Sequence, residues 1–248
     1  MLTSYTPLVL TVAGFDPSAG AGILADIKAF EHCKVYGQAV CTALTVQNEK
    51  HFENSNWLSW EQIKEQLEIL FRVRNFGYIK IGLVENPKTL ELILKWLRKK
   101  NPESFILWDP ILRASSGFEF HKQNTLSWQK LFSYVNLLTP NLPEAEFLGI
   151  TSGSPKTAVL LKGGHYPATP LCTDLLFMPN SPAPLKFTSK RINAERHGSG
   201  CTLSALILAN FAKCNNLEKS IRVAKKAMQR FFAHGSGRLG VLSALENF

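Results

Sequence analysis

The chain has 248 residues, of which 45% are hydrophobic and 19% charged, and its formal net charge is +9. This composition is ordinary for a globular protein, and the length suffices for one large core. The basic excess is compatible with nucleic acid, with an anionic surface or with phosphorylated small ligands. The positive side chains are scattered, however, and neither zinc-finger spacing nor an RNA-binding signature is present. We therefore predict an anionic small-molecule ligand and no nucleic-acid partner.

The five cysteines favour a reduced protein over a disulfide-stabilised one. They form no Cys-x-x-Cys pair and no zinc-binding spacing, and their number is odd. The N-terminus lacks the basic segment and the apolar run of a secretion signal. No apolar run approaches the roughly 20 residues of a membrane-spanning helix. These features predict a cytoplasmic protein with no membrane partner.

The first 48 residues predict a strand, a glycine-rich turn, a helix and a second strand. The strands are expected over 8–12 and 35–45, and the turn over 14–22. This order indicates a βαβ unit and hence a parallel sheet. The turn does not have the Gly-x-Gly-x-x-Gly spacing of a dinucleotide-binding site.

Three polar or flexible positions of this unit are candidates for ligand binding. Gly14 and Gln47 follow the two strands, and ligands of such sheets bind beyond the carboxyl ends of strands. Asp26 lies one turn into the helix and is within reach of the same edge. Taken singly, each position is more readily explained as a turn residue or a solvated helix residue.

The rest of the chain continues the alternation of helices and strands. Periodicity predicts helices over 60–73, 87–99 and 202–213, strands over 78–81, 105–108, 135–139 and 158–161, a hairpin of strands 171–177 and 185–192, and a last helix with Ile221, Ala224, Met228 and Phe231 on one face. No repeat, linker or low-complexity tract interrupts it. We therefore expect a single α/β domain over residues 1–248.

Two acidic positions point to a metal or phosphate site. Asp109 ends a predicted strand, and the following loop, 111–117, is either a flap carrying Arg113 or an ordinary surface loop. Asn141 and Glu144 are three residues apart at the start of a predicted helix, where they would hold Mg²⁺ directly or through water. The plain structural alternative is a helix cap formed by Asn141 with Glu144 in the first turn.

The stretch from Gly198 to Thr202 predicts an anion site. Glycines allow close approach of the backbone, and a helix start offers unpaired N–H groups and a partial positive charge. Cys201 at this place is expected to have a lowered pKa. The alternative is a plain cap, with Ser199 as the N-cap residue, Gly200 in the loop and Cys201 as a small buried residue.

The whole chain resembles the hydroxymethylpyrimidine/phosphomethylpyrimidine kinases of thiamine biosynthesis. The resemblance rests on five strings in order, which are residues 13–22 with Asp26, 42–48, 80–83, 139–146, and 161–165 with 197–202. It implies a ribokinase-like fold, a three-layer α/β architecture with a mostly parallel sheet and helices on both faces. It also implies ATP and Mg²⁺ as co-substrate and cofactor.

The resemblance further implies a role for each matched residue. Gly14, Asp26 and Gln47 would bind the aminopyrimidine, or its monophosphate, with Leu83 and Ile111 near the ring; Asn141 and Glu144 would hold Mg²⁺–ATP; Lys162 and Asp109 would lie at the nucleotide phosphates; and the backbone of Gly198, Ser199, Gly200 and Cys201 would form the anion hole. A thiolate at Cys201 would serve as general base where most of the superfamily has aspartate. Homodimers are common in this family, so a homodimer is expected.

Three departures from the family pattern stand out. Phe15 and Ala19 replace the usual serine or threonine and the usual glycine. The segment 147–158 is too short for the helix usually found there, so the strand 158–161 is expected to be less well covered. In the flap, Arg113 stands where relatives often have lysine near Ser115.

Other functions remain open on the sequence alone. A pyridoxal or pyridoxine kinase shares the fold and, in some members, the cysteine. A vitamer-binding protein that has lost catalysis is a different class. A cysteine hydrolase using Cys201 with His197 is disfavoured, because no orienting acid is evident.

Overall fold

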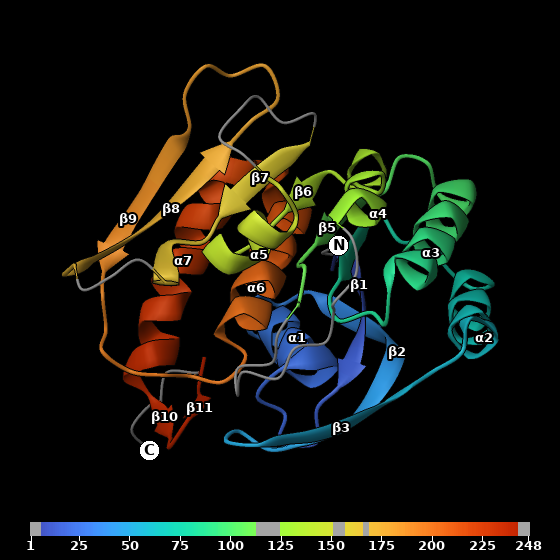
Figure 1. The fold of residues 1–248 in the computed structure, drawn as a ribbon, viewed down its shortest axis with the longest axis horizontal. Coiled ribbons are helices and arrows are strands. Elements are labelled where there is room, and N and C mark those ends of the chain that lie inside the picture. The colour runs from blue at the N-terminus through green and yellow to red at the C-terminus, as the bar shows by residue number, and fades with distance from the viewer. Residues whose placement is uncertain (1–5, 113–124, 151–156, 166–168, 243–248) are drawn as a thin grey trace, which may run out of the picture.

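A sheet of nine strands forms the centre of the computed structural model, which describes residues 6–112, 125–150, 157–165 and 169–242 (Figure 1). The spatial order is β3-β2-β1-β4-β5-β6-β7-β8-β9. The strands are β1 (Leu8–Phe15), β2 (Tyr36–Gln47), β3 (Phe52–Trp57), β4 (Tyr78–Ile81), β5 (Phe105–Trp108), β6 (Leu137–Leu138), β7 (Ala158–Leu161), β8 (Leu171–Phe177) and β9 (Leu185–Lys190). A separate two-stranded ribbon joins β10 (Gly235–Ser236) to β11 (Leu239–Gly240).

The strands from β2 to β7 in this order run parallel, and the sheet ends in antiparallel strands on both sides. β3 pairs antiparallel with β2, and the hairpin β8–β9 is added antiparallel to β7. Parallel neighbours need crossover connections, which the helices supply. The helices are α1 (Gly22–His32), α2 (Trp60–Phe71), α3 (Pro87–Lys100), α4 (Thr125–Gln129), α5 (Leu142–Phe147), α6 (Ser199–Cys214) and α7 (Leu217–Ala233).

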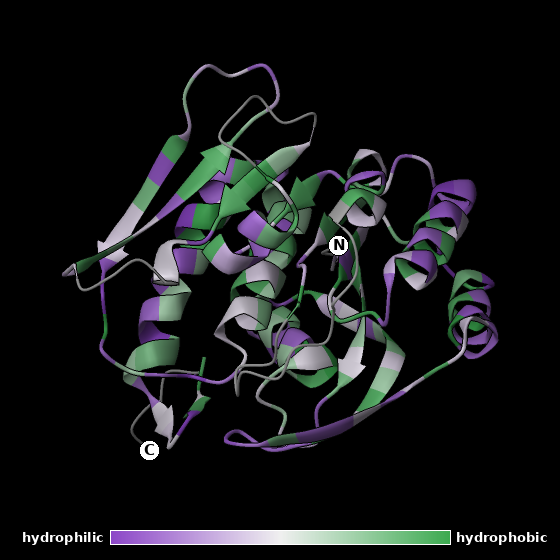
Figure 2. Ribbon diagram, in the orientation of Figure 1, coloured by the Kyte–Doolittle hydropathy of each residue, from purple (hydrophilic) through white to green (hydrophobic). Residues whose placement is uncertain are grey.

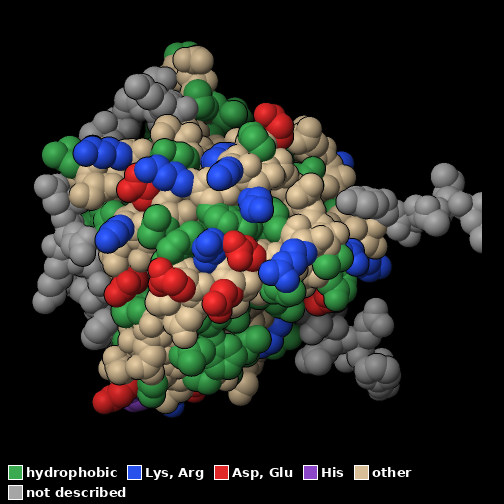
Figure 3. Space-filling model, turned by 90° about the vertical axis from the view of Figure 1, so that its right-hand side faces the viewer, with side chains coloured by type: hydrophobic (Ala, Val, Ile, Leu, Met, Phe, Trp, Pro, Cys, Tyr) green, Lys and Arg blue, Asp and Glu red, His purple; other side chains and the backbone are tan. Residues whose placement is uncertain are grey.

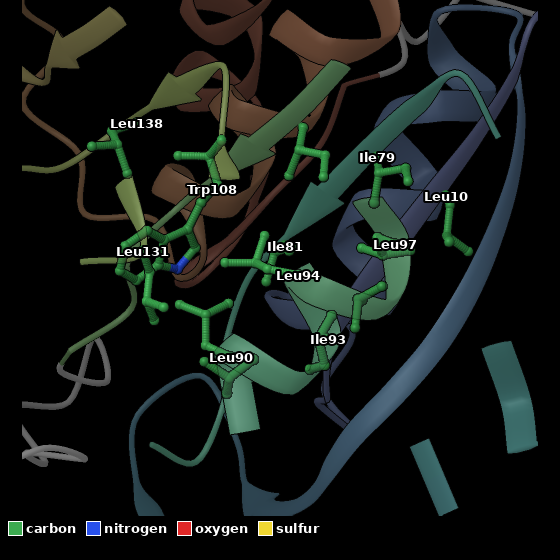
Figure 4. Close-up of a cluster of buried hydrophobic side chains, with 14 of the residues drawn as sticks. Leu10, Ile79, Ile81, Leu90, Ile93, Leu94, Leu97, Trp108, Leu131 and Leu138 are labelled. Carbon is green, nitrogen blue, oxygen red and sulfur yellow. The ribbon is translucent and has the colours of Figure 1, made fainter. Parts of the chain in front are cut away.

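Alternating side chains of the parallel strands enter two separate cores. Leu10, Ile79 and Trp108 belong to the core that α2, α3 and α4 cover (Figure 4). Val9 and Leu107, one position away on their strands, belong to the core that α1, α6 and α7 cover. Successive strand residues point to opposite faces, so near-continuous apolar strands are buried on both sides. The result is the predicted three-layer α/β architecture.

The helix ends follow from local sequence. Asn86 accepts a hydrogen bond from the Thr89 backbone N–H at 2.9 Å, and Pro87 occupies the first position of α3. Green stripes facing the sheet and purple stripes facing outward run along α2 and α3 in Figure 2. This pattern is the helical amphipathicity from which both helices were predicted.

The structure departs from the predicted elements at several places. β6 is shorter than the predicted strand 135–139, and α4 and the β10–β11 ribbon were not predicted. The polar segment Phe52–Trp57 forms the edge strand β3, which pairing with β2 holds in place rather than burial. α6 begins at Ser199 rather than at Thr202, with Gly198 as its N-cap. β7 is not poorly covered as expected, since Val159 is 2% exposed and packs in the core that contains Leu148.

The surface gives no sign of a uniform basic field on the face that Figure 3 presents. Blue and red side chains are intermixed across the upper part of this face, and a green apolar area lies in its lower part. None of the helices in the described ranges has the length and apolar character needed to span a bilayer.

Leu94 tests the α3 side of the core. It is fully buried, so we expect Leu94→Ala to lower the free energy of unfolding by about 2–5 kcal/mol, because the lost transfer energy and the cavity add. Ile69→Ala on the exposed side of α2 is the control, with an expected change within about 0.5 kcal/mol. Urea denaturation measures both, and equal losses would contradict the assignment of this face to the core.

Candidate functional site

A cavity of about 890 Å³ opens at the carboxyl ends of the parallel strands. β1 lies between β2 and β4, so later strands are added first on one side of β1 and then on the other. In open α/β sheets, ligands bind at such a reversal of the strand order. Of the residues predicted for a site, those that line this cavity are Gly14, Gln47, Leu83, Ile111, Asn141, Glu144, Lys162, Gly198, Ser199, Gly200 and Cys201. The structure thus brings together residues from positions 14 to 201 of the chain.

The N-terminus of α6 forms part of the cavity wall. The first helical hydrogen bond runs from the Thr202 N–H to the Gly198 carbonyl at 2.9 Å. The N–H groups of Ser199, Gly200 and Cys201 therefore have no carbonyl partner within the helix. Three aligned donors at the positive end of a 16-residue helix make a site for phosphate oxygens.

Gly198 is required by its backbone. Its φ of +67° lies in the left-handed region, and a Cβ there would collide with the carbonyl oxygen of Gly20. The loop before α6 is therefore pressed directly against the turn between β1 and α1. The same turn holds Ala19 at φ 55°, which explains in physical terms why glycine suits that position.

An ion-pair-like contact between Asp16 and His197 joins the same two loops. His197 Nε2 lies 2.8 Å from Asp16 Oδ2, and both side chains are buried. Asp16 also accepts from the backbone N–H groups of Ser18 at 2.9 Å and Ala21 at 2.8 Å. Burial alone would raise the pKa of Asp16, but the donors of His197, Ser18 and Ala21 outweigh it and hold this pKa below its ordinary value.

Sequence reasoning missed this contact because 181 residues separate its partners. It also decides one alternative. A cysteine hydrolase needs an imidazole that bonds to the carboxylate through one nitrogen and to the thiol through the other, whereas His197 bonds to Asp16 through Nε2 and its Nδ1 has no hydrogen-bond partner among the described residues. The carboxylate that was not evident in the sequence is Asp16. Its contact with His197, here called the loop clamp, orients the imidazole and joins the two loops.

Lys162 lies on the other side of residues 198–201, here called the anion loop, and between two carboxylates. Its Nζ is 2.8 Å from Asp109 Oδ1 and 3.7 Å from Glu144 Oε2. A Cβ on Gly200 would lie 3.3 Å from this ammonium, so the charge sits directly beside the loop. Burial disfavours the ammonium, but the two carboxylates raise the pKa of Lys162 and keep it charged.

Asn141 and Glu144 form the helix cap that was the structural alternative. Asn141 Oδ1 accepts from the Glu144 N–H at 2.9 Å, and Glu144 Oε2 accepts from the Asn141 N–H at 2.7 Å. Both also line the cavity, so the cap fixes them at its wall. Burial raises the pKa of Glu144 to about 7, with Lys162 opposing this shift and Asp109 adding to it.

The donor set at this wall fits Mg²⁺. The described residues contain no cluster of three or more His, Cys, Asp or Glu side chains suited to a metal. Mg²⁺ commonly takes one or two carboxylates and completes its shell with water and substrate phosphates. Glu144, with the amide of Asn141 beside it, matches that requirement next to the charge of Lys162.

Two predicted residues do not reach the cavity surface. Asp26 and Asp109 are both 0% exposed and are bound to lysines, Asp26 to Lys80 and Asp109 to Lys162. Asp109 also accepts from the hydroxyl groups of Thr139 at 2.9 Å and Ser204 at 3.0 Å. Buried and bound in this way, Asp26 is not placed to accept a hydrogen bond directly from a ring in the cavity.

The expected lowering of the Cys201 pKa is wrong. Cys201 is 8% exposed, and its burial raises the pKa of the thiol to about 11. The charge of Lys80 favours the thiolate, whereas Asp109 and Asp26 disfavour it. Proximity to a helix N-terminus predicted the opposite, because the sequence does not reveal the dehydration and the neighbouring carboxylates.

The two ends of the cavity differ in chemistry. At one end, Gln47 Nε2 donates to Thr45 Oγ1 at 2.8 Å, which places a fixed amide beside Gly14 and Leu83. The other end lies between the β9 end of the sheet and α7, and its lining includes Ser189, Ile192, Met228, Gln229 and Phe232. No motif in the sequence marked this second end. Arg113, Ser115 and residues 151–156 lie outside the described residues.

Comparison with known proteins gives consistent matches along the chain. A family model described as phosphomethylpyrimidine kinase matches residues 16–240. A hydroxymethylpyrimidine/phosphomethylpyrimidine kinase of Aquifex aeolicus is 34% identical over 236 residues, covering 88% of this chain and 91% of the relative. One from Staphylococcus aureus is 32% identical over 238 residues, covering 88% and 85%.

Solved structures agree on the fold. A phosphomethylpyrimidine kinase from Clostridium difficile has a TM-score of 0.72 at 29% identity, covering 90% of this chain and 98% of its own. A pyridoxal kinase from Staphylococcus aureus in complex with pyridoxal has a TM-score of 0.82 at 23% identity, covering 96% and 93%. The same enzyme was solved in complex with ADP, with a TM-score of 0.81. The predicted ribokinase-like fold is confirmed.

Asp16→Asn tests the loop clamp. The variant keeps the size but loses charge-assisted hydrogen bonds, so we expect the free energy of unfolding at pH 7 to fall by roughly 1–3 kcal/mol. The folded pKa of Asp16 is lowered, so its stabilisation is complete above its ordinary pKa and disappears as the pH falls through the folded value.

Urea denaturation between pH 7 and pH 3 measures the difference between the two proteins. It should shrink below about pH 4, the ordinary range of aspartate. The control is Glu195→Gln, which removes a carboxylate that is 83% exposed and paired with Arg238. A difference that stays constant with pH would contradict the clamp.

Proposed function

The chain belongs to the phosphomethylpyrimidine kinase family, and from that membership we propose that it phosphorylates 4-amino-5-hydroxymethyl-2-methylpyrimidine and then the monophosphate, using ATP. The observation that carries this proposal is the position of the α6 N-terminus. It stands between the end of the cavity lined by Gly14, Gln47 and Leu83 and the end toward α7, with Lys162 beside it. A phosphoryl group passing between two ligands needs this arrangement.

We assign the acceptor to the end lined by Gly14, Gln47 and Leu83. The Gln47 carboxamide offers a donor and an acceptor side by side, which suits the edge of an aminopyrimidine. The side chain of Leu83 supplies apolar contact for the ring. Asp26 supports this end from beneath, through Thr11 on β1, rather than by touching the ring.

We assign the nucleotide to the end toward α7. Met228 and Phe232 on α7 and Ile192 after β9 provide apolar contacts for a base. Lys162 then meets the phosphates beside the anion loop, and Asp109 holds Lys162 there at 2.8 Å. Asn141 and Glu144 would hold Mg²⁺, which when bound neutralises charge on the phosphates.

In the first step the hydroxymethyl oxygen forms a bond to the γ-phosphorus, and the bond from that phosphorus to the ADP oxygen breaks. The hydroxyl proton passes to the thiolate form of Cys201, a minor form near pH 7, and restores the neutral thiol. Charge spreads over the equatorial oxygens, where the N–H groups of Ser199, Gly200 and Cys201 and the Lys162 ammonium stabilise it. In the second step the acceptor is already an anionic phosphate oxygen, so no base is required.

The homodimer stays a prediction.

Product analysis tests the function directly. The protein is incubated with Mg²⁺–ATP and the hydroxymethylpyrimidine, with pyridoxal in parallel, and the products are identified by mass spectrometry. We expect the pyrimidine monophosphate followed by the diphosphate. Pyridoxal phosphate alone would instead make the chain a pyridoxal kinase. Binding of either ligand by folded protein without phosphorylation would make it a vitamer-binding protein.

Cys201→Ala separates the two steps. The first phosphorylation should fall by about 10²-fold or more, the usual effect of removing a general base, while the second changes by only a few-fold. Because the thiol has a pKa of about 11, the wild-type rate of the first step should rise with pH between pH 7 and pH 9, and the variant should not show this rise. Equal losses in both steps would contradict the role of Cys201 as a base.

A further inference from the structure

A buried ion pair lies beneath the acceptor end of the cavity. Lys80 on β4 is 0% exposed, and its Nζ lies 2.8 and 2.9 Å from the two carboxylate oxygens of Asp26 on α1. The Thr11 hydroxyl donates to Asp26 Oδ2 at 2.6 Å. Neither Lys80 nor Asp26 lines the cavity, so the pair acts on a ligand only through other residues.

This pair is a poor source of stability. Dehydrating two charges costs about as much as their attraction returns, and apolar residues of similar size often stabilise as well or better. Lys80 is also the third residue of β4, between Ile79 and Ile81, and it pairs with Thr11 on β1 and with Leu107 on β5. A charge in such a place acts strongly on ionisable groups nearby, because the protein interior screens it little.

The nearby group is Cys201. Lys80 pairs with Leu107 on β5, two residues before Asp109, and the Ser204 hydroxyl on α6 lies 3.0 Å from both Asp109 Oδ2 and the Cys201 carbonyl oxygen. The backbone N–H of Gly22, at the start of α1, also interacts with the Cys201 sulfur. α6 packs against α1 and against β4, so the thiol lies where the first turns of α1 and α6 meet, above the strand that carries Lys80.

Four charged side chains act on this sulfur. Lys80 is the charge that most favours the thiolate, and Lys162 adds to it from the nucleotide side. Asp109 and Asp26 oppose it. Each carboxylate is paired with its own lysine, so the opposing effects within each pair partly cancel at the sulfur. Removing the charge of Lys80 or of Asp26 alone therefore changes the stability of the Cys201 thiolate.

We propose that Lys80 is a positioning residue that acts through Cys201, its buried ammonium supplying the charge that stabilises the thiolate at the start of α6. This role rests on the proposed function, in which Cys201 takes the hydroxyl proton of the acceptor. Lys80 touches neither substrate nor phosphate.

Alkylation of Cys201 by iodoacetamide tests the proposal without any substrate. Below the thiol pKa the alkylation rate follows the thiolate fraction, about tenfold for each pKa unit. Asp26→Asn leaves the ammonium uncompensated, so Cys201 should react about tenfold faster at pH 8 than in the wild type. Lys80→Met/Asp26→Asn removes both charges, so without the ammonium the rate should fall below the wild-type rate.

Peptide mapping by mass spectrometry gives the rate at each cysteine separately. Cys33 is 7% exposed and serves as the internal control, because general loosening of the fold would accelerate both cysteines. Lys28→Met, on the exposed side of α1, is the matched control and should change neither rate. Lys80→Arg, which keeps the charge, should hold the Cys201 rate near the wild-type value.

Unchanged Cys201 reactivity in Asp26→Asn or in the double variant would overturn the role of Lys80, even if the protein phosphorylates the pyrimidine. The expected changes in reactivity in a protein that phosphorylates nothing would leave the Lys80–Cys201 coupling standing and refute the kinase. The two failures are therefore distinguishable.

Discussion

Charge balance among dehydrated side chains beneath the N-terminus of α6 is the constraint on which the site depends. Asp26 and Asp109 are fully buried carboxylates, and each is bound to a lysine, Lys80 or Lys162. A buried charge without a partner is costly, so the elements that carry these groups must meet. The two pairs thereby connect α1 to β4 and the end of β5 to the residue after β7. The anion loop is built above this neutral base, with its N–H groups directed at the cavity.

The second constraint is the contact between the two loops that carry the phosphate and acceptor ends of the site. Gly198 and Gly20 allow the backbones to touch, and the Asp16–His197 contact closes them from the side. Because the same contact fixes the entry to α6 and the turn before α1, the anion hole and the acceptor wall form one rigid unit. Orientation of this kind is a large part of catalysis when the protein performs little covalent chemistry of its own.

Local patterns in the sequence predicted most of the elements in their order, and they marked one end of the cavity. Apolar strands and amphipathic helices predicted a parallel α/β sheet, and the resemblance to the pyrimidine kinases, carried by five ordered strings of residues, implied the three layers and most of the site residues. What the sequence did not reveal depends on tertiary contacts. β3 is held by backbone pairing with β2 and has a polar sequence, Asp16 meets His197 only in the folded chain, and the burial of Asp26 and of Cys201 follows from the packing of α1 and α6 on the sheet.

A thiol with a raised pKa suits an enzyme that must accept two different nucleophiles. With Lys80 and Lys162 matched by Asp26 and Asp109, a permanently ionised group at position 201 would leave the cluster negative beside the acceptor. An alcohol would tolerate that charge, but a phosphate monoester would be repelled by it. Cys201 is neutral near pH 7 because its pKa is about 11, so the anionic acceptor of the second step meets only the N–H groups and the Lys162 ammonium. The cost falls on the first step, where a loose transition state lessens the need for a strong base.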